Sequence, residues 1–388
     1  MPGLDGVRGA AILLVFAYHV LRSIPYNTRG AEWLHRTANT GWIGVDLFFV
    51  LSGFLITGIL LDTKSGPGYF RLFYGRRALR ILPLYLTFVT VLLLALPALP
   101  LMSPAQAEAL RQAKGWYWSH AVNVMIARHG WEHGTWHSGH LWSLSLEEQF
   151  YACWPAVVYV LSRRRLIGAS VTLILGVWIF RAALVAAGVS WTAIYVLLPT
   201  RVDTLAMGAL LAAVARERAD WFRLRRWIAP AVGSALVLAY GFRHDALLRS
   251  SAFTQVLGYP ALGLLGCAAV VHAVTAPVGS LGRHVWANSS LRFFGRYSYG
   301  LYVWHVPLIP VVRRYVFAPE QVGAIDGSIV PAYLLFSLVA LTCSVILALV
   351  SWHLIEAPFL SLKTYLPYTR RETLPAADLN IAPIPTAP

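Results

Sequence analysis

The chain has 388 residues, of which 57% are hydrophobic and only 13% are charged, and its mean hydropathy is +0.59. A soluble domain carries about 25% charged residues, so this composition excludes an ordinary soluble protein and predicts an all-α integral membrane protein. The formal net charge of +15 does not indicate a nucleic-acid partner, because the basic residues fall in short runs between apolar segments, as topology signals do.

Ten apolar segments approach the length of about 20 residues that spans a bilayer as a helix. We therefore expect a bundle of about ten transmembrane helices. In chain order the segments cover about 7–23, 42–61, 80–100, 141–161, 166–187, 193–214, 227–242, 252–274, 296–315 and 332–355. With the N-terminus inside, 19 Lys and Arg residues fall in cytoplasmic segments and 10 in outer loops. The positive-inside rule thus predicts a multi-pass plasma-membrane protein with both termini cytoplasmic.

The transmembrane domain is expected to occupy residues 1–366. Residues 367–388 contain the Pro- and Ala-rich stretch "LPAADLNIAPIPTAP" and are predicted to form a disordered cytoplasmic tail. The three cysteines, Cys153, Cys267 and Cys343, all lie in apolar segments, which argues against disulfides and against a metal cluster. We expect neither a permanently bound cofactor nor a metal.

The first apolar segment, "LDGVRGAAILLVFAYHV", carries three ionisable residues, Asp5, Arg8 and His19. Arg8 and His19 are 11 residues apart, so they share a helix face and lie about 16 Å apart along the axis. Asp5 is close enough to pair with Arg8. Ionisable groups inside a membrane segment usually have a function, so this face predicts a link between a cytoplasmic cation and a deep titratable base. The alternative is an interfacial arginine and a hydrogen-bonded core histidine.

The next two apolar segments each offer polar candidates. In "GWIGVDLFFVLSGFLITG", Asp46 lies near the predicted outer end, where it is expected either to orient His19 or to cap the helix. Gly53, seven residues later, makes the same face small enough for close packing. In "YGRRALRILPLYL", Arg77 and Arg80 face the same way and could bind the phosphates of a donor; an ordinary positive-inside anchor is equally compatible.

The fourth apolar segment opens with "HLWSLSLEEQFYACWP", where Glu147 and Glu148 need polar partners. Glu147 and Tyr151 share a face at a spacing of four. We expect Glu147 to point inward and to hold His19 or a substrate hydroxyl.

Other polar residues receive structural interpretations. Arg201 and Asp203 are two apart in the sixth segment, so they are expected to pair with other helices rather than with each other, and a contact with the acceptor is the alternative. His305 is expected to be a hydrogen-bonded bundle residue rather than a second base. The histidines of "RHGWEHGTWHSGH" are interrupted by glycines, so a polar lid over an acceptor is favoured over a zinc site.

Six motifs occur together in one order over most of the chain: "LDGVRGAAILLVFAYH", "GVDLFFVLSGFLIT", "RRALRILPLY", "LWSLSLEEQFY", "RYSYGLYVWHVPL" and "EAPF". From Leu4 to about Phe359 the sequence thereby resembles the membrane acyltransferase-3 family of O-acyltransferases. These enzymes modify surface polysaccharides, peptidoglycan and some secondary metabolites. The resemblance implies a ten-helix membrane fold and transfer of an acyl group, usually acetyl, from acyl-CoA to a hydroxyl.

The resemblance also implies roles for the residues already singled out. The family's Arg-x10-His pattern falls on Arg8 and His19, its Arg-x-x-Arg pattern on Arg77 and Arg80, and its acids on Asp46 and Glu147. Acyl-CoA phosphates are then expected on Arg8, Arg77 and Arg80. His19 would be the general base, with Asp46 or Glu147 fixing its tautomer.

The sequence leaves the acceptor and the acyl chain length open. A surface sugar fits the family, and a macrolide-like metabolite is an alternative acceptor. The rival function is a transporter or flippase without acyl-transfer chemistry, which buried charges and many helices also suit. Such transporters often show internal repeats, and none is evident here.

Overall fold

The computed structural model describes residues 1–25, 28–217, 226–245 and 247–368, and over this part of the chain it is helical without β-strands. The predicted disordered tail lies, from residue 369 onward, outside the described residues. The long helices are α1 (Pro2–Leu21), α3 (Gly44–Thr63), α4 (Tyr69–Thr90), α8 (Trp142–Val160), α9 (Arg163–Ala186), α11 (Leu198–Glu217), α12 (Ile228–Arg243), α13 (Tyr259–Thr275), α16 (Ser298–Tyr315) and α17 (Val330–Ser351). The short helices are α2 (Arg29–Ala38), α5 (Pro104–Gln112), α6 (Lys114–Trp118), α7 (Val122–His129), α10 (Trp191–Val196), α14 (Leu281–Trp286), α15 (Ser289–Arg296) and α18 (Ala357–Ser361).

The described residues contain seven helical stretches that are long and apolar enough to cross a membrane. They are Pro2–Leu21, Arg29–Thr63, Tyr69–Ala98, Arg163–Ala186, Trp191–Glu217, Thr254–Thr275 and Val330–Tyr365. The all-α membrane fold is therefore confirmed, but the expected ten spans are not. The remaining three segments do form helices, yet α12 has only 16 residues, and α8 and α16 carry polar residues that lower their apolar character.

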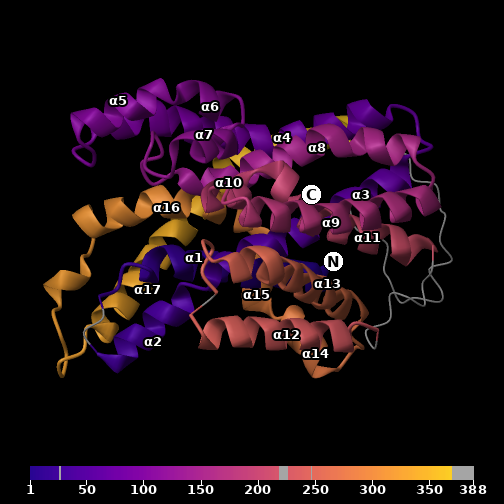
Figure 1. Ribbon diagram of the computed structural model, residues 1–388. Helices are drawn as coiled ribbons and strands as arrows, with labels where there is room; N and C mark the ends of the chain where they lie inside the picture. Colours follow the sequence, from indigo (N-terminus) through magenta and orange to yellow (C-terminus); the bar gives the residue numbers. More distant parts are fainter. Residues whose placement is uncertain (26–27, 218–225, 246, 369–388) are drawn as a thin grey trace.

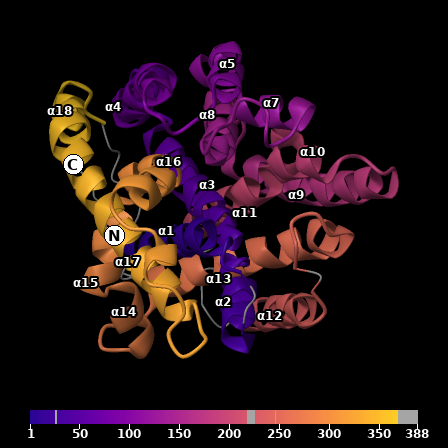
Figure 2. The ribbon, with the colours of Figure 1, turned by 90° about the vertical axis from the view of Figure 1, so that its left-hand side faces the viewer.

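Helix α1 occupies the centre of the bundle. In the view along the bundle, α1 and α3 lie in the middle and the other long helices are arranged around them (Figure 2). Helix α1 packs against α3, α13, α15 and α16, and its apolar side chains belong to all four buried clusters. The short helices α5, α6 and α7 lie together at one corner, next to α8 and α10 (Figure 1). The ionisable residues of α1 are thus surrounded by protein rather than by lipid.

Glycine allows α1 to approach its neighbour α15 closely. A Cβ atom built on Gly9 would lie 1.9 Å from the carbonyl oxygen of Leu291, and one built on Gly295 would lie 1.8 Å from that of Asp5. Neither position can take a side chain without separating the two backbones. Small residues commonly provide such contacts between membrane helices, because lipid gives apolar side chains no reason to associate.

The same kind of contact joins α3 to α11. A Cβ on Gly53 would lie 1.9 Å from the carbonyl oxygen of Leu205, and one on Gly208 would lie 2.0 Å from that of Val50. The expectation that the Gly53 face allows close packing is therefore confirmed. This contact brings the polar residues of α11 against the end of α3 that carries Asp46.

We predict that Gly53→Ala destabilises the protein by about 1–3 kcal/mol, because the added methyl group meets backbone that cannot rotate away. The measurement is thermal unfolding of the purified protein in detergent. Gly176→Ala in α9 is the matched control, since no atom lies within 4 Å of a Cβ at that position. Gly176→Ala should leave the stability of the protein unchanged or raise it. Equal unfolding temperatures for the two variants would contradict the packing described here.

Candidate functional site

A basic cavity of about 840 Å³ lies at the end of the bundle where α1 begins. Its cationic lining residues come from α1, α4, α15 and the C-terminal segment: Arg8, Arg76, Arg77, Arg80, Arg292, Arg296 and Lys363. The carboxylates Asp5 and Asp62 also line it. Asp5 pairs with Arg8 at 3.1 Å, and Asp62 pairs at 2.7 Å with Arg216, which lies outside the lining. The cavity thus has a surplus of positive charge and suits a polyanionic ligand.

Aromatic rings form the rest of this cavity's wall. Phe293, Tyr297, Trp352 and Tyr368 all line it. The C-terminal segment is fastened there by Arg76, which donates to the carbonyl oxygen of Leu366 at 2.9 Å and lies 4.5 Å from the Tyr368 ring centroid. Cations and ring faces together provide a surface for a ligand that has both phosphates and a flat base.

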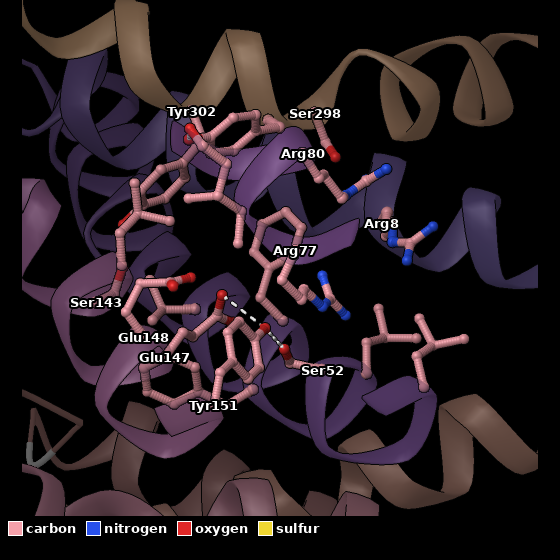
Figure 3. Close-up of a pocket in the computed structure, with 18 residues that line it drawn as sticks. Arg8, Ser52, Arg77, Arg80, Ser143, Glu147, Glu148, Tyr151, Ser298 and Tyr302 are labelled. Carbon is pink, nitrogen blue, oxygen red and sulfur yellow. Dashed lines mark hydrogen bonds between the residues drawn. The ribbon is translucent and has the colours of Figure 1, made fainter. Parts of the chain in front are cut away.

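A narrower pocket of about 120 Å³ adjoins the basic cavity. The two spaces share Arg8, Leu55, Arg77 and Arg80. In Figure 3 these three arginines lie toward one end of the pocket, while Ser143 and Tyr302 lie toward the other. Because apolar side chains of α3 also line the pocket, it can hold the slender, less polar part of a ligand whose anionic end occupies the cavity.

Glu147 lies in the wall of this narrower pocket. Tyr151 donates to the Glu147 carboxylate at 3.2 Å and is also hydrogen bonded to Ser52 (Figure 3). The guanidinium of Arg77 lies 4.9 Å from the Tyr151 ring centroid. The predicted shared face of Glu147 and Tyr151 is therefore confirmed. Tyr151 contacts both the Glu147 carboxylate and Arg77, which lies at the arginine end of the pocket.

The far end of the pocket is hydrogen bonded to a cluster of three histidines. Ser143 Oγ and the Tyr302 hydroxyl lie 2.6 Å apart, and Tyr302 donates to the carbonyl oxygen of His140 at 2.9 Å. The ring centroids of His140 and His305 are 5.4 Å apart, and those of His305 and His19 are 5.0 Å apart. His19 itself lines neither the cavity nor the pocket, so it stands behind this wall.

The hydrogen bonds around His19 decide which of its nitrogens carries the proton. His305 Nδ1 lies 3.0 and 2.9 Å from the carbonyl oxygens of Leu301 and Tyr302, which can only accept. His305 Nδ1 must therefore carry its proton, and the Nε2 of a neutral His305 must accept. That Nε2 lies 3.2 Å from His19 Nδ1, which is also 2.9 Å from the carbonyl oxygen of Val15. His19 is thus protonated at Nδ1, and its Nε2 keeps a lone pair and makes no hydrogen bond within the described residues.

The segment between α7 and α8 lies over these histidines at the end of the bundle away from the basic cavity. Tyr117 donates to the carbonyl oxygen of Gly134 at 2.8 Å and is hydrogen bonded to Ser138 at 2.5 Å, which fixes the segment. Burial lowers the pKa of His137 in this segment, and the positive charge of Arg22 lowers it further. Among the described residues, no group of three or more His, Cys, Asp or Glu is placed to hold a metal ion.

Comparison with known proteins identifies the family. A family model described as an acyltransferase domain matches residues 1–349. The chain belongs to this acyltransferase family. No solved structure matches the chain. The resemblance first drawn from the six sequence motifs is thereby confirmed.

Curated relatives of this acyltransferase are similar over nearly all of the chain. A putative O-acetyltransferase of Staphylococcus aureus strain MSSA476 is 29% identical over 384 residues. YrhL of Bacillus subtilis, named a putative peptidoglycan O-acetyltransferase, is 30% identical over 375 residues, and the O-acetyltransferase OatA of S. aureus strain NCTC 8325 is 27% identical over 391. Each match covers 92% of the chain but only 54–57% of the relative. The chain thus spans little more than half the length of these relatives.

The structure of the acyltransferase brings most of the predicted site residues together. Arg8, Arg77 and Arg80 line both the cavity and the pocket, and Glu147 lines the pocket. His19 lines neither space, and its ring centroid lies 6.4 Å from that of His140 and 5.0 Å from that of His305. The predicted contact of His19 with Asp46 or Glu147 is absent, because the hydrogen bonds of His19 go to Val15 and His305.

Asp46 makes an ion pair instead. Its Oδ1 lies 2.5 Å from Arg201 of α11, and both side chains are almost wholly buried, at 1% and 0% exposure. Its Oδ2 has no partner, so Asp46 does not orient His19. Asp203 likewise pairs with Arg181 of α9 at 2.9 Å, which confirms that Arg201 and Asp203 bind other helices rather than each other. The close contact of α3 with α11 places Asp46 against an arginine that spacing along the chain could not reveal.

Sequence reasoning missed several residues of this site. His305 was assigned to the bundle, and it is hydrogen bonded there, but its contact with His19 joins positions 286 residues apart. Arg292, Arg296 and Lys363 are among the 19 cytoplasmic basic residues that the sequence marks only as topology signals, although they line the cavity. These basic residues lie close to α1 in the folded protein, and the order of the chain could not reveal this proximity.

We predict that Asp46→Ala destabilises the acyltransferase by about 3–5 kcal/mol, because it leaves Arg201 buried without its counter-charge. Thermal unfolding in detergent measures the loss. The double variant Asp46→Leu/Arg201→Met should recover most of it, since no unpaired charge then remains. A double variant as unstable as Asp46→Ala would show that the pair is not the cause.

Proposed function

We propose that this chain is an O-acyltransferase that moves an acetyl group from acetyl-CoA to a hydroxyl of a carbohydrate. The observation that supports the proposal best is that the basic cavity opens into the narrow pocket, and that the far wall of this pocket is hydrogen bonded to the histidine cluster that contains His19. The cationic cavity suits the phosphates of acyl-CoA, and its rings suit an adenine base. The pocket suits the slender pantetheine arm that carries the thioester toward His19.

His19 is proposed as the general base. Its Nε2 takes the proton of the acceptor hydroxyl while the hydroxyl oxygen attacks the thioester carbonyl carbon. The tetrahedral intermediate then collapses, the carbon–sulfur bond breaks, and the proton passes from His19 to the leaving thiolate. No proton is gained or lost overall, and the acceptor leaves as an ester. His305 is proposed as a positioning residue, because its Nε2 holds the Nδ1–H of His19 and keeps Nε2 of that ring unprotonated.

The relatives support a sugar acceptor. One is named a putative peptidoglycan O-acetyltransferase, and another an O-acetyltransferase. Membership of an acyltransferase family also favours chemistry over a transporter without it. We propose that the donor enters from the cytoplasm, because the end of the bundle where α1 begins carries the basic cavity and the charge distribution predicts that the N-terminus lies inside.

The test of donor use is acetyl transfer from labelled acetyl-CoA in isolated membranes. His19→Ala should lower turnover by about 10²–10⁴-fold with donor binding retained, as expected for loss of a general base. Arg77→Ala should instead raise the KM for acetyl-CoA by about 10-fold or more, since charge-assisted hydrogen bonds contribute about 1.5–3 kcal/mol. Arg71→Ala is the matched control, because Arg71 lies on the same helix but is exposed outside the cavity.

Three results would contradict the proposal. Full activity of His19→Ala would leave that histidine as a packing residue. Equal effects of Arg71→Ala and Arg77→Ala would make the cavity irrelevant to the donor. Substrate uptake into vesicles without any transfer of label would favour the transporter.

The role of His305 is tested separately. His305→Leu should lower kcat by about 10–100-fold, as loss of an orienting partner does at other histidine sites, with KM for acetyl-CoA unchanged. His305→Gln should recover part of the rate, because an amide oxygen can accept from His19 Nδ1. His353→Leu is the control, since His353 is exposed and its ring bonds only to the carbonyl oxygen of Leu349 in its own helical turn. If the leucine and glutamine variants at 305 are equally slow, a positioning role through this hydrogen bond is excluded.

A further inference from the structure

Four aromatic rings surround the guanidinium of Arg249 at the end of the bundle opposite the basic cavity. The carbon of that guanidinium lies 5.2 Å from the ring centroids of Tyr18 and Tyr195, 5.4 Å from Trp131 and 5.8 Å from Trp191. These residues come from α1, α10 and the two segments before α8 and before α13. Four aromatic side chains from three separate parts of the chain therefore converge on one cation, and we call this group of five residues the Arg249 cage.

The cage holds a positive charge without a carboxylate. Arg201 also lies against Tyr195, but it is paired with Asp46, and Arg181 is paired with Asp203. Among the residues that the structure describes, no carboxylate is within ion-pair distance of Arg249. Rings stabilise a cation through their faces, whereas the N–H groups of a guanidinium point outward in its plane. Apart from a hydrogen bond with Tyr195, these donors are available to an anion.

A second polar group in the cage lacks a partner. The indole nitrogen of Trp131 is buried and makes no hydrogen bond. The Trp131 ring lies nearly parallel to that of Trp191, with the centroids 6.3 Å apart and the planes at 21°. Arg249, Trp131 and Trp191 are each only partly buried. A ligand can therefore reach the exposed parts of the guanidinium and of the two tryptophan rings, whereas the Trp131 N–H lies beneath the surface.

The backbone that carries Arg249 is held in place. Its carbonyl oxygen accepts from Gln255 at 3.2 Å and from the Tyr259 hydroxyl at 3.4 Å. Earlier in the same segment, Asp245 pairs with Arg36 of α2 at 2.9 Å. The position of the guanidinium is thus set before any ligand binds, which lowers the entropic cost of binding.

The cage adjoins the proposed base. Tyr18, one wall of the cage, also contacts His19, with ring centroids 4.8 Å apart. Arg8 and the basic cavity lie about 16 Å away, at the other end of α1. A molecule held by the cage would therefore approach His19 from the side opposite to the donor.

We propose that the Arg249 cage is the acceptor subsite and that it selects a saccharide carrying an acidic group. The guanidinium would pair with the acid, and the exposed parts of the tryptophan rings would cover the apolar face of the sugar ring. This inference rests on the proposed acyl-transfer function. It adds the chemical class of the acceptor, an anionic rather than a neutral sugar.

The test measures binding of defined probes to the purified protein by calorimetry. Trigalacturonic acid is compared with its methyl ester, which has the same rings without the charge, and glucose 6-phosphate is compared with glucose. The wild-type protein should bind trigalacturonic acid at least 10-fold more tightly than the ester. Arg249→Gln should abolish this preference. Arg243→Gln, an exposed arginine at the end of α12, should keep it. A preference for the charged sugar in either comparison supports an anionic acceptor, and the comparison in which it occurs identifies the acidic group as a carboxylate or a phosphate.

A second variant keeps the test informative if Arg249→Gln fails to fold. Trp131→Ala removes one aromatic ring of the cage but keeps Arg249, so it should weaken binding of both the acid and the ester while preserving the preference for the acid. The inference is overturned if the wild-type protein prefers neither charged probe over its neutral partner, or if a folded Arg249→Gln variant retains the preference. Label transfer from acetyl-CoA with no acid preference would refute the cage alone. Acid-selective binding without label transfer would refute the proposed function alone.

Discussion

Burial of α1 within the bundle is the constraint on which the rest of the structure depends. A helix that carries Asp5, Arg8 and His19 cannot face lipid at low cost, so each ionisable group must find a partner in protein. Glycines let α15 approach α1 so closely that a Cβ at Gly9 would overlap the neighbouring backbone. Arg8 then pairs with Asp5, and His19 bonds to His305 of α16. The helix thereby brings a cation and a base into one protein interior, at fixed separation and on one face.

The two ends of α1 differ in their electrostatic surroundings. Several cations line the cavity near Arg8. The two carboxylates there, Asp5 and Asp62, are already paired with arginines, so the cavity favours a large polyanion. Around Asp46 the charges instead cancel in buried pairs with α11, which gives this region little net field and makes it a structural support. The Arg249 cage is intermediate, because aromatic faces stabilise a single charge that has no acid beside it. These differences follow from which helices carry acids, and they distinguish the proposed donor end from the proposed acceptor end.

The proposed chemistry depends on one hydrogen bond between two neutral histidines. A carboxylate beside His19 would stabilise its protonated form, as in a serine-protease triad. His305 can only accept the Nδ1 proton, since its own Nδ1 is bound to two carbonyl oxygens. His305 therefore fixes the tautomer of His19, but it stabilises a protonated His19 less than a carboxylate would. Such a base suits transfer from a thioester, in which the proton passes directly to the leaving sulfur and no lasting charge has to be stored on the ring.

Composition and local spacing determined the membrane fold, the shared face of Arg8 and His19, the pairing of Glu147 with Tyr151, and the family. These properties depend on hydropathy and on helical periodicity, which are local. Tertiary structure decided the partners: Asp46 with Arg201 rather than His19, His305 with His19, and Arg292 and Lys363 in the same cavity as Arg77. The helix bounds in the structure also leave seven stretches among the described residues that are long and apolar enough to cross a membrane. Contacts between residues hundreds of positions apart depend on how helices pack, and helical periodicity says only which face a residue occupies, not which neighbour that face will meet.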